Sequence, residues 1–340
     1  MGKMSGAALL LPVVFLSFFA AVSCSSDEED ELVGNWVKVS DFDGVARCSA
    51  VTFTVDGDVY VATGGYGGYK YRLDDLWVFN EDSGTWTQKA SMDGAARTYA
   101  VGFGTNRYGY VGLGYDGDNY LNDFWKYDPS ANSWTRVSDF GGSPRRAAVA
   151  FSVTGKGYVG CGYDGNHLKD FWRYDEDADS WVQITSMGGS KRMGASSFVI
   201  DDIAYIVGGE NNSECVTDFW AFDPSTETWT EKREIRNVSD EDYDDDYGTI
   251  ARSYGVAFAM YGLGYFTCGE NAGSGRTATW EYDPVNDLWT ERTSYEAGTR
   301  SEAVGFSVGN RGFVLTGKSG TYQYDDMWEF FPTEEYDEYD

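Results

Sequence analysis

Six arginines stand at the same place in six copies of one short motif, and a guanidinium group can bind a carboxylate through two parallel hydrogen bonds. The copies read RCSAVTF, RTYAVGF, RRAAVAF, RMGASSF, RSYGVAF and RSEAVGF, and they begin at Arg47, Arg97, Arg145, Arg192, Arg252 and Arg300. We predict that one to three of these arginines are accessible to a ligand. The alternative is that each is bonded to carbonyls or to an aspartate of a neighbouring repeat. The phenylalanine that closes each copy is expected in the core.

A second set of polar side chains follows, or lies close to, a glycine at the end of a short apolar run in each repeat. The residues there are aromatic or charged: Tyr66, Tyr115, Tyr163, Glu210, Glu270 and Lys318. Aromatic rings could stack on a ligand, and carboxylates could accept hydrogen bonds from its hydroxyl groups. With the arginines, these residues predict a binding pocket.

Strands must position these side chains. DLWVFNEDSGTW (75–86) is typical of five segments in which two tryptophans stand nine residues apart around a turn rich in Asp, Pro, Ser and Asn. That composition predicts strand, tight turn, strand. The arginine motif and the glycine-ended run, such as YVGLG (110–114), add two strands to each repeat. In the fifth copy, Thr279 stands where the others have an aspartate.

The two ends of the chain complete one repeat. DMWEFF (326–331) has a first tryptophan without a second, and GNWVKV (34–39) has a second without a first. The unit of about 50 residues resembles the kelch repeat over roughly residues 35–331. The resemblance implies an all-β fold, a six-bladed β-propeller at 34–332 with four-stranded antiparallel blades, closed by the N-terminal strand joining the last blade.

The kelch resemblance also suggests where ligands bind. In kelch domains that serve as adaptors for ubiquitin ligases, arginines at this repeat position meet acidic peptides, and the tyrosine of the GYDG loop lies on the same face. The pocket is therefore expected at one mouth of the central channel. Galactose oxidase shares the repeat, but its copper site needs two histidines, and this chain has only His167. That chemistry is excluded.

One loop is similar to that of kelch-type N-acetylneuraminate epimerases. GENAGSGRT (269–277) carries Glu270 and Arg276 six residues apart, followed by Thr277. The resemblance implies proton transfer by Glu270 while Arg276 holds the sugar carboxylate. Nucleophilic hydrolysis is not expected, because there is no G-x-S-x-G motif and the lone histidine has no evident Ser or Cys partner.

The formal charge is −29, so a nucleic-acid backbone would be repelled. Three acidic runs, at 27–31, 240–247 and 334–340, hold 16 of the 55 carboxylates. Such runs predict solvated, mobile segments. The run at 240–247 belongs to an insertion near 236–247 that is expected to project as a loop from one face, and it lacks the spacing of a calcium loop. Four cysteines are expected to be mostly buried thiols. We expect no cofactor or metal.

The N-terminus resembles a bacterial lipoprotein signal peptide (1–23), with Cys24 as the lipidated residue. An acidic tether (24–33) follows and resembles the export signal of surface lipoproteins in the Bacteroidetes. An acidic tail (333–340) ends the chain. This predicts a Gram-negative outer-membrane protein, lipid-anchored and surface-exposed. A periplasmic orientation and ordinary secretion are the alternatives.

The sequence therefore predicts a monomeric, lipid-anchored propeller that binds an extracellular glycan or protein at one channel mouth. A sialic-acid epimerase that uses Glu270 and Arg276 is one alternative. A scaffold subunit of an outer-membrane assembly is another.

Overall fold

The computed structural model describes residues 1, 2, 32–337 and 339. Residues 3–23 of the signal peptide predicted at 1–23, together with Cys24 and most of the acidic tether, lie outside these residues. No helix in the described part of the chain is long and apolar enough to cross a membrane.

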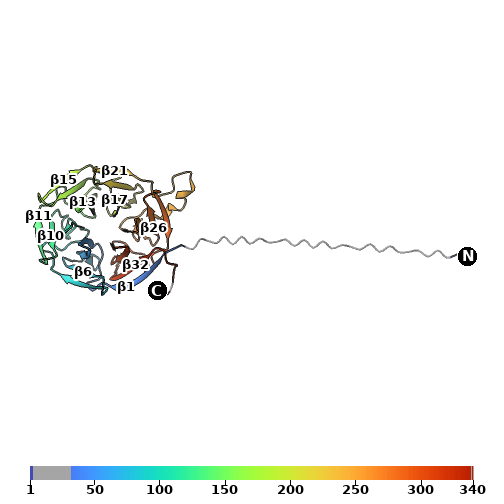
Figure 1. Cartoon of the computed structure of the whole chain (residues 1–340), viewed down its shortest axis with the longest axis horizontal. Helices are drawn as coiled ribbons and strands as arrows, with labels where there is room; N and C mark the ends of the chain where they lie inside the picture. The colour runs from blue at the N-terminus through green and yellow to red at the C-terminus, as the bar shows by residue number, and fades with distance from the viewer. Residues whose placement is uncertain (3–31, 338, 340) are drawn as a thin grey trace. The chain divides into compact units, whose positions relative to one another are not determined.

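Six four-stranded antiparallel sheets follow one another in chain order around a ring, and each is one blade (Figure 1). Blades 1 to 3 are β2 (Val51–Val55), β3 (Asp58–Ala62), β6 (Leu76–Asn80) and β7 (Thr85–Lys89); β8 (Val101–Gly104), β9 (Gly109–Gly112), β10 (Phe124–Asp128) and β11 (Ser133–Val137); and β12 (Val149–Val153), β13 (Lys156–Gly160), β14 (Phe171–Asp175) and β15 (Ser180–Ile184).

Blades 4 to 6 are β16 (Ser196–Ile200), β17 (Ile203–Val207), β20 (Trp220–Asp223) and β21 (Thr228–Glu231); β22 (Val256–Met260), β23 (Leu263–Thr267), β26 (Thr279–Asp283) and β27 (Leu288–Arg292); and β28 (Val304–Val308), β29 (Arg311–Leu315), β32 (Asp326–Phe331) and β1 (Asn35–Asp41). Two-residue strands form four hairpins: β4 (Gly65–Tyr66) with β5 (Tyr71–Arg72), β18 (Glu210–Asn211) with β19 (Glu214–Cys215), β24 (Glu270–Asn271) with β25 (Ser274–Gly275), and β30 (Lys318–Ser319) with β31 (Tyr322–Gln323).

The last blade is closed by the first strand of the ring. β1 pairs antiparallel with β32, with Trp36 opposite Phe330 and Lys38 opposite Trp328. Figure 1 shows the blue β1 beside the red β32. The predicted six blades and their closure are confirmed.

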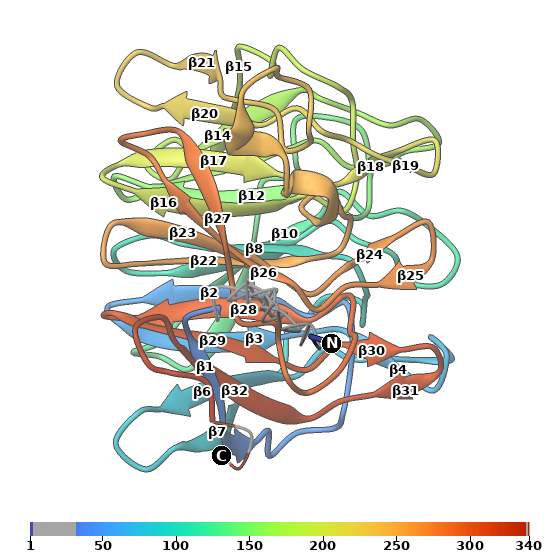
Figure 2. The ribbon, with the colours of Figure 1, turned by 90° about the vertical axis from the view of Figure 1, so that its right-hand side faces the viewer.

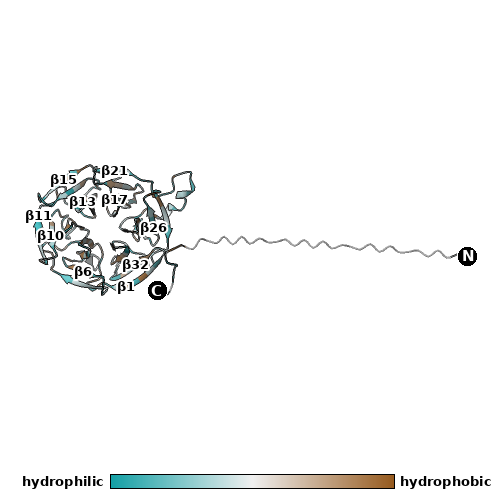
Figure 3. Ribbon diagram, viewed as in Figure 1, coloured by the Kyte–Doolittle hydropathy of each residue, from teal (hydrophilic) through white to brown (hydrophobic). Residues whose placement is uncertain are grey.

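The blades pack through an aromatic that fits over a glycine of the next blade. Phe53 stacks on Tyr60 within blade 1, with ring centroids 5.1 Å apart. A Cβ on Gly109 in blade 2 would lie 2.0 Å from the Phe53 ring, so only glycine fits there. The same phenylalanine is buried in every blade, as predicted: Phe53, Phe103, Phe151, Phe198, Phe258 and Phe306. Hydrophobic residues accordingly lie within the blades, and the outer rim is hydrophilic (Figure 3).

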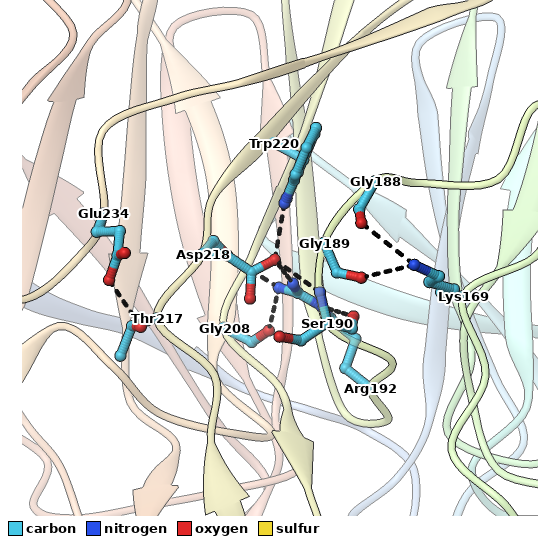
Figure 4. Close-up of polar contacts among 10 residues, drawn as sticks. All are labelled: Lys169, Gly188, Gly189, Ser190, Arg192, Gly208, Thr217, Asp218, Trp220 and Glu234. Atoms are coloured by element: carbon cyan, nitrogen blue, oxygen red, sulfur yellow. Dashed lines mark hydrogen bonds and ion pairs between the residues drawn. The ribbon is translucent and has the colours of Figure 1, made fainter.

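All six repeat arginines are buried inside their own blades, with at most 1% of each exposed. In blade 2, Arg97 forms an ion pair of 2.7 Å with Asp123 and donates to the carbonyl of Leu113 at 3.1 Å. The same aspartate accepts a hydrogen bond from Trp125 Nε1. Figure 4 shows the blade 4 version, in which Arg192 binds Asp218 beside Trp220. We call this arrangement the arginine clamp.

The carbonyl that the clamp holds belongs to a residue in a left-handed backbone conformation. Such a conformation costs about 1–2 kcal/mol for a residue with a Cβ. In five blades the residue is not glycine: Thr63, Leu113, Cys161, Cys268 and Thr316, with φ between 55° and 63°. The hydrogen bond from the arginine offsets this strain.

Two closed rings of backbone hydrogen bonds join the blades at the same level. The glycine that ends the second strand donates its N–H to the carbonyl of the next blade's repeat arginine, from Gly64 to Arg97 at 3.0 Å and around to Gly317 and Arg47 at 2.8 Å. The residue two places after each arginine donates to its counterpart in the preceding blade. These six residues are Ser49, Tyr99, Ala147, Gly194, Tyr254 and Glu302. The repeat arginine therefore fixes its own blade through its side chain and the adjacent blade through its backbone.

The clamps correct two sequence expectations. Each aspartate lies in the arginine's own blade rather than in a neighbouring one, and none of the six arginines has the accessibility predicted for one to three of them. In blade 5 the aspartate position is Ala278, not Thr279, because the aspartate stands two residues before the tryptophan. Arg252 donates to the Ala278 carbonyl there instead.

The acidic insertion supplies what blade 5 lacks. It folds into two 3₁₀ turns, η1 (Asp242–Asp244) and η2 (Tyr247–Thr249). Thr249 takes both roles of the missing aspartate: its hydroxyl accepts from Trp280 Nε1 at 3.0 Å, and its carbonyl accepts from Arg252 at 2.6 Å. With no carboxylate beside it, burial lowers the pKa of Arg252 to about 10.

The insertion also packs more closely than its charge suggests. Tyr247 and Asp244 are buried, and the Asp244 carboxylate accepts hydrogen bonds from the backbone of Val238 and Ser239 at 2.8 and 2.9 Å. Figure 1 shows this loop extending outward from the rim between β21 and β26. The insertion thus extends from the rim rather than from one face as predicted, and it is anchored in the junction between blades 4 and 5, where the Tyr247 hydroxyl accepts a hydrogen bond from the backbone N–H of Trp289.

Removal of one clamp aspartate tests how much the clamps stabilise the fold. Asp123→Ala leaves a buried guanidinium without its counter-charge, so the free energy of unfolding should fall by about 3–5 kcal/mol. The matched control, Asp139→Ala, breaks an exposed pair with Arg136 and should cost under about 1 kcal/mol. Urea denaturation followed by circular dichroism gives both values.

The same contribution should depend on pH. Burial opposes ionisation of Asp123, but the hydrogen bond and charge of Arg97 outweigh it and hold its pKa below the usual 3.8. The stabilisation is therefore complete at neutral pH and is lost as the pH falls through the lowered pKa. Equal losses in the two variants at pH 7 would contradict the role of the clamp.

Candidate functional site

The residue after each repeat arginine pairs with the residue that follows the glycine of the second strand. This brings together, in ring order, Cys48 with Gly65, Thr98 with Tyr115, Arg146 with Tyr163, Met193 with Glu210, Ser253 with Glu270, and Ser301 with Lys318. Figure 2 shows β4 and the hairpins β18–β19, β24–β25 and β30–β31 on one face of the ring. The equivalent pairing in the other blades assigns Tyr115 and Tyr163 to the same face as Glu210 and Glu270, and we call the channel opening on this face the arginine-side mouth.

Two tyrosines from opposite blades form the floor of this mouth. Tyr99 comes from blade 2 and Tyr254 from blade 5, and their ring centroids are 6.0 Å apart. The Tyr254 ring lies over Gly194, where a Cβ would come within 2.8 Å of it. The recess that they line with Glu302 and several alanines has a volume of about 120 Å³. That is the room of roughly four waters.

One wall of the mouth is occupied by a hydrogen-bonded group around Glu302. Its buried carboxylate accepts from Tyr69 at 2.6 Å and from Tyr99 at 2.9 Å, and it forms an ion pair of 2.7 Å with Lys318. Ser49 donates to it as well. These contacts join blades 1, 2 and 6, so this part of the mouth is rigid and its charges are paired.

Glu210 and Glu270 stand on the opposite wall, and neither forms an ion pair with any of the described basic residues. Glu210 accepts a hydrogen bond from Ser253 Oγ at 3.4 Å, and Glu270 accepts one from Ser301 Oγ at 3.4 Å. Burial and the charge of Glu270 raise the pKa of Glu210 above its usual value of 4.5, although Ser253 and Arg146 act in the other direction. The two carboxylates retain acceptor capacity for a ligand.

Arg146 brings a guanidinium group to the tyrosines of this mouth in place of the buried repeat arginines. It immediately follows Arg145, and its side chain lies over Tyr99 at 5.4 Å and over Tyr120 and Tyr163 at 5.8 Å each. It is half-buried, and its Nε has no hydrogen-bond partner.

Tyr66 does not take the place predicted for it. Gly65 occupies the position equivalent to Tyr115, and Tyr66, one residue later, stacks on Tyr71 within its own hairpin at 4.9 Å. The extra glycines of GGYGG shift the register. Tyr69 supplies the aromatic ring at the mouth instead, through its contact with Tyr99 at 5.7 Å.

Glu270 and Arg276 lie on two arms of one hairpin but leave it on opposite sides. Glu270 pairs with Gly275, and residues paired across two strands share a face while the next residue points to the other. No ion pair joins Glu270 to Arg276 among the residues that the structure covers. The side chains therefore do not converge on one sugar as the epimerase resemblance implies.

The remaining candidates for covalent or proton chemistry are poorly suited to it. Burial raises the pKa of the Cys48 and Cys161 thiols to about 12 and of Cys268 to about 11, so they stay protonated and unreactive. These three are buried and Cys215 is half-buried, as expected. His167 packs against Tyr163 at 5.1 Å, and burial lowers its pKa.

The pocket at the opposite mouth of the channel is larger, with a volume of about 630 Å³, but it has fewer charged side chains. Backbone, small hydroxyl side chains and Asn106 line it, and Asp56 is its one ionisable residue among those described. The chemistry is concentrated on the arginine side.

The fold and its repeats decide the family. The sequence profile of the KLHDC2/KLHL20/DRC7 Kelch-repeats domain matches residues 35–209 and 110–242, which together cover more than half of the chain. The chain belongs to the kelch-repeat family. No curated protein sequence matches it. A kelch propeller is typically a binding or scaffold module. In this chain, the side chains at the two positions after each repeat arginine determine the chemistry of the arginine-side mouth.

Sequence reasoning missed the residues that shape this kelch mouth most. They are Arg146, Tyr99, Tyr254, Glu302 and Tyr69. The first four stand one or two places after a repeat arginine, where the copies differ in chemical type inside a constant frame. That variability was the available signal. Tyr69 had none, because its position depends on the shifted register of its hairpin.

The raised pKa of Glu210 can be tested through its neighbour. Glu270→Gln removes one of the two causes, so the pKa of Glu210 should fall toward 4.5 and stay above it, because burial remains. Glu270→Asp keeps the charge and should leave the pKa of Glu210 raised. Carboxyl ¹³C NMR across a pH titration measures both. An unchanged pKa in Glu270→Gln would show that the two carboxylates do not interact.

Proposed function

We propose that this kelch protein is a non-catalytic binding module that holds a glycan at the arginine-side mouth. The observation that carries the proposal is the division between two sets of polar groups. The guanidinium groups of the repeat arginines are buried and bonded within the clamps, whereas Arg146, Glu210 and Glu270 lie at the arginine-side mouth with little or no pairing to other described residues. None of the three takes part in a clamp, so we assign them to ligand binding.

The chemistry of the mouth favours a glycan over a protein surface. Carboxylates accept hydrogen bonds from sugar hydroxyls, and tyrosine faces pack against the apolar faces of sugar rings. A recess of about 120 Å³ takes the end of a chain. A stable protein partner would need about 800 Å² of contact on this side, much of it outside the recess.

The location of the protein follows from its N-terminus. The apolar stretch of residues 7–22 and the sequence AVSC before the acidic tether support a lipid anchor at Cys24. An anchored propeller at the cell surface would hold extracellular glycans next to the outer membrane. Loss of membrane association in Cys24→Ser, measured by cell fractionation, tests the anchor.

A glycan array probed with the full chain in detergent tests the binding function. The wild-type protein should retain a defined set of glycans. Glu210→Gln combined with Glu270→Gln should weaken that retention at least tenfold, because both acceptor carboxylates lose their charge.

The control is Asp56→Asn at the opposite mouth, which should bind like the wild type. Loss of binding in the control alone would show that the glycan binds at the opposite mouth and would contradict the proposal. Absence of glycan binding, together with co-purification of outer-membrane proteins that is insensitive to both changes, would favour the scaffold alternative.

A further inference from the structure

We propose, on the basis of the binding function above, that the ligand is an acidic saccharide whose carboxylate is received by Arg146. The glycan class is otherwise open, because hydroxyl groups alone would satisfy Glu210 and Glu270. The positive charge of Arg146 at the same mouth narrows the class of glycan to acidic sugars.

Arg146 is held in position by rings rather than by acceptors. The rings of Tyr99, Tyr120 and Tyr163 pack around its guanidinium, with the ring centroids 5.4–5.8 Å from the guanidinium carbon. Among the described residues Arg146 hydrogen-bonds only through its backbone: its N–H donates to the carbonyl of Tyr163 at 3.0 Å, and its carbonyl accepts from the N–H of Tyr163 at 2.9 Å. An arginine has five N–H donors in a planar fork, and this fork matches a carboxylate through two bonds.

The neighbouring Arg145 shows what a structural arginine looks like in the same fold. Its side chain is 1% exposed, pairs with Asp170 at 2.7 Å, and donates to the carbonyls of Cys161 and Ser143 at 3.0 Å each. Every donor group of Arg145 is used, whereas the Arg146 side chain has no acceptor among the residues that the structure describes. Two adjacent arginines in one motif therefore have different roles.

Arg146 and the two glutamates lie near the tyrosines that floor the same mouth, and they do not neutralise one another. The charge of Arg146 reaches Glu210 and opposes the rise of its pKa, and both charges act on Tyr254 in the floor. No ion pair joins Arg146 to either glutamate in the part of the chain that the structure describes. A ligand that carries a carboxylate beside several hydroxyls, such as a uronic acid, can satisfy both walls at once. A peptide terminus offers the carboxylate without the hydroxyls.

Because the net charge of the protein is negative, binding of an acidic sugar depends on its direct contact with the Arg146 guanidinium. At −29 the chain repels anions at long range, so non-specific attraction cannot account for retention of an acidic sugar. Binding must come from the guanidinium itself.

Saturation-transfer NMR on the full chain in detergent, with four small probes, tests the proposal. The probes are D-glucuronate, D-glucose, D-glucosamine and N-acetyl-dialanine with a free carboxylate. Glucuronate should bind at least tenfold more tightly than glucose. Arg146→Gln should lower the affinity for glucuronate at least tenfold, and Arg146→Lys should recover part of it, because a charge remains without the planar fork.

The matched control is Arg136→Gln, at an exposed arginine of the outer strand β11, which should leave binding unchanged. Preference for glucosamine, or binding of N-acetyl-dialanine as tight as that of glucuronate, would overturn the proposal. Equal affinity for glucose and glucuronate, both lost with the double glutamate change, would overturn the role of Arg146 while the glycan-binding function stands. Failure of every sugar here and on the array would overturn that function as well.

Discussion

One buried arginine per blade holds this propeller together in two directions. In five blades its guanidinium binds an aspartate of the same blade. In all six it donates to the carbonyl of a left-handed residue, and its own carbonyl accepts a hydrogen bond from the preceding blade. A buried charge pair is costly to desolvate and costly to break, so the geometry around it is closely fixed. Because the arginine is fixed, the next two residues reach the channel mouth in a set position whatever their side chains are. The residue that stabilises the fold and the residues that form the mouth are therefore direct neighbours in the sequence.

The fifth blade shows how strongly the fold depends on this contact. Ala278 cannot pair with Arg252, and the acidic insertion brings Thr249 into the position that the aspartate would occupy. An insertion that looks like a solvated loop in the sequence is therefore part of the clamp. Its carboxylates remain largely at the surface, while Tyr247 and Asp244 are buried.

The sequence predicts the fold well because the fold is repetitive. The paired tryptophans, the glycine-ended strands and the incomplete repeats at 34–39 and 326–331 correctly gave six blades and their closure. The site was predicted only in part. Tyr115, Tyr163, Glu210 and Glu270 occupy equivalent positions in their blades, and their role in binding stays a prediction; the repeat arginines are buried, because recurrence in every copy marks a structural role. The shift of Tyr66 and the contribution of Tyr69 depend on hairpin register, which residue spacing does not specify. The opposite directions of Glu270 and Arg276 likewise follow from strand pairing rather than from their separation in sequence.

The most direct test compares the two adjacent arginines of the third blade on the same samples. Arg145→Gln and Arg146→Gln would each be measured for the free energy of unfolding by urea denaturation and for glucuronate affinity per folded molecule. Arg145→Gln should lose about 3–5 kcal/mol of stability, because Asp170 is left half-buried and unpaired, and should keep its affinity. Arg146→Gln should keep its stability and lose its affinity. The opposite assignment, or the loss of both properties in both variants, would contradict the separation of structural and binding arginines.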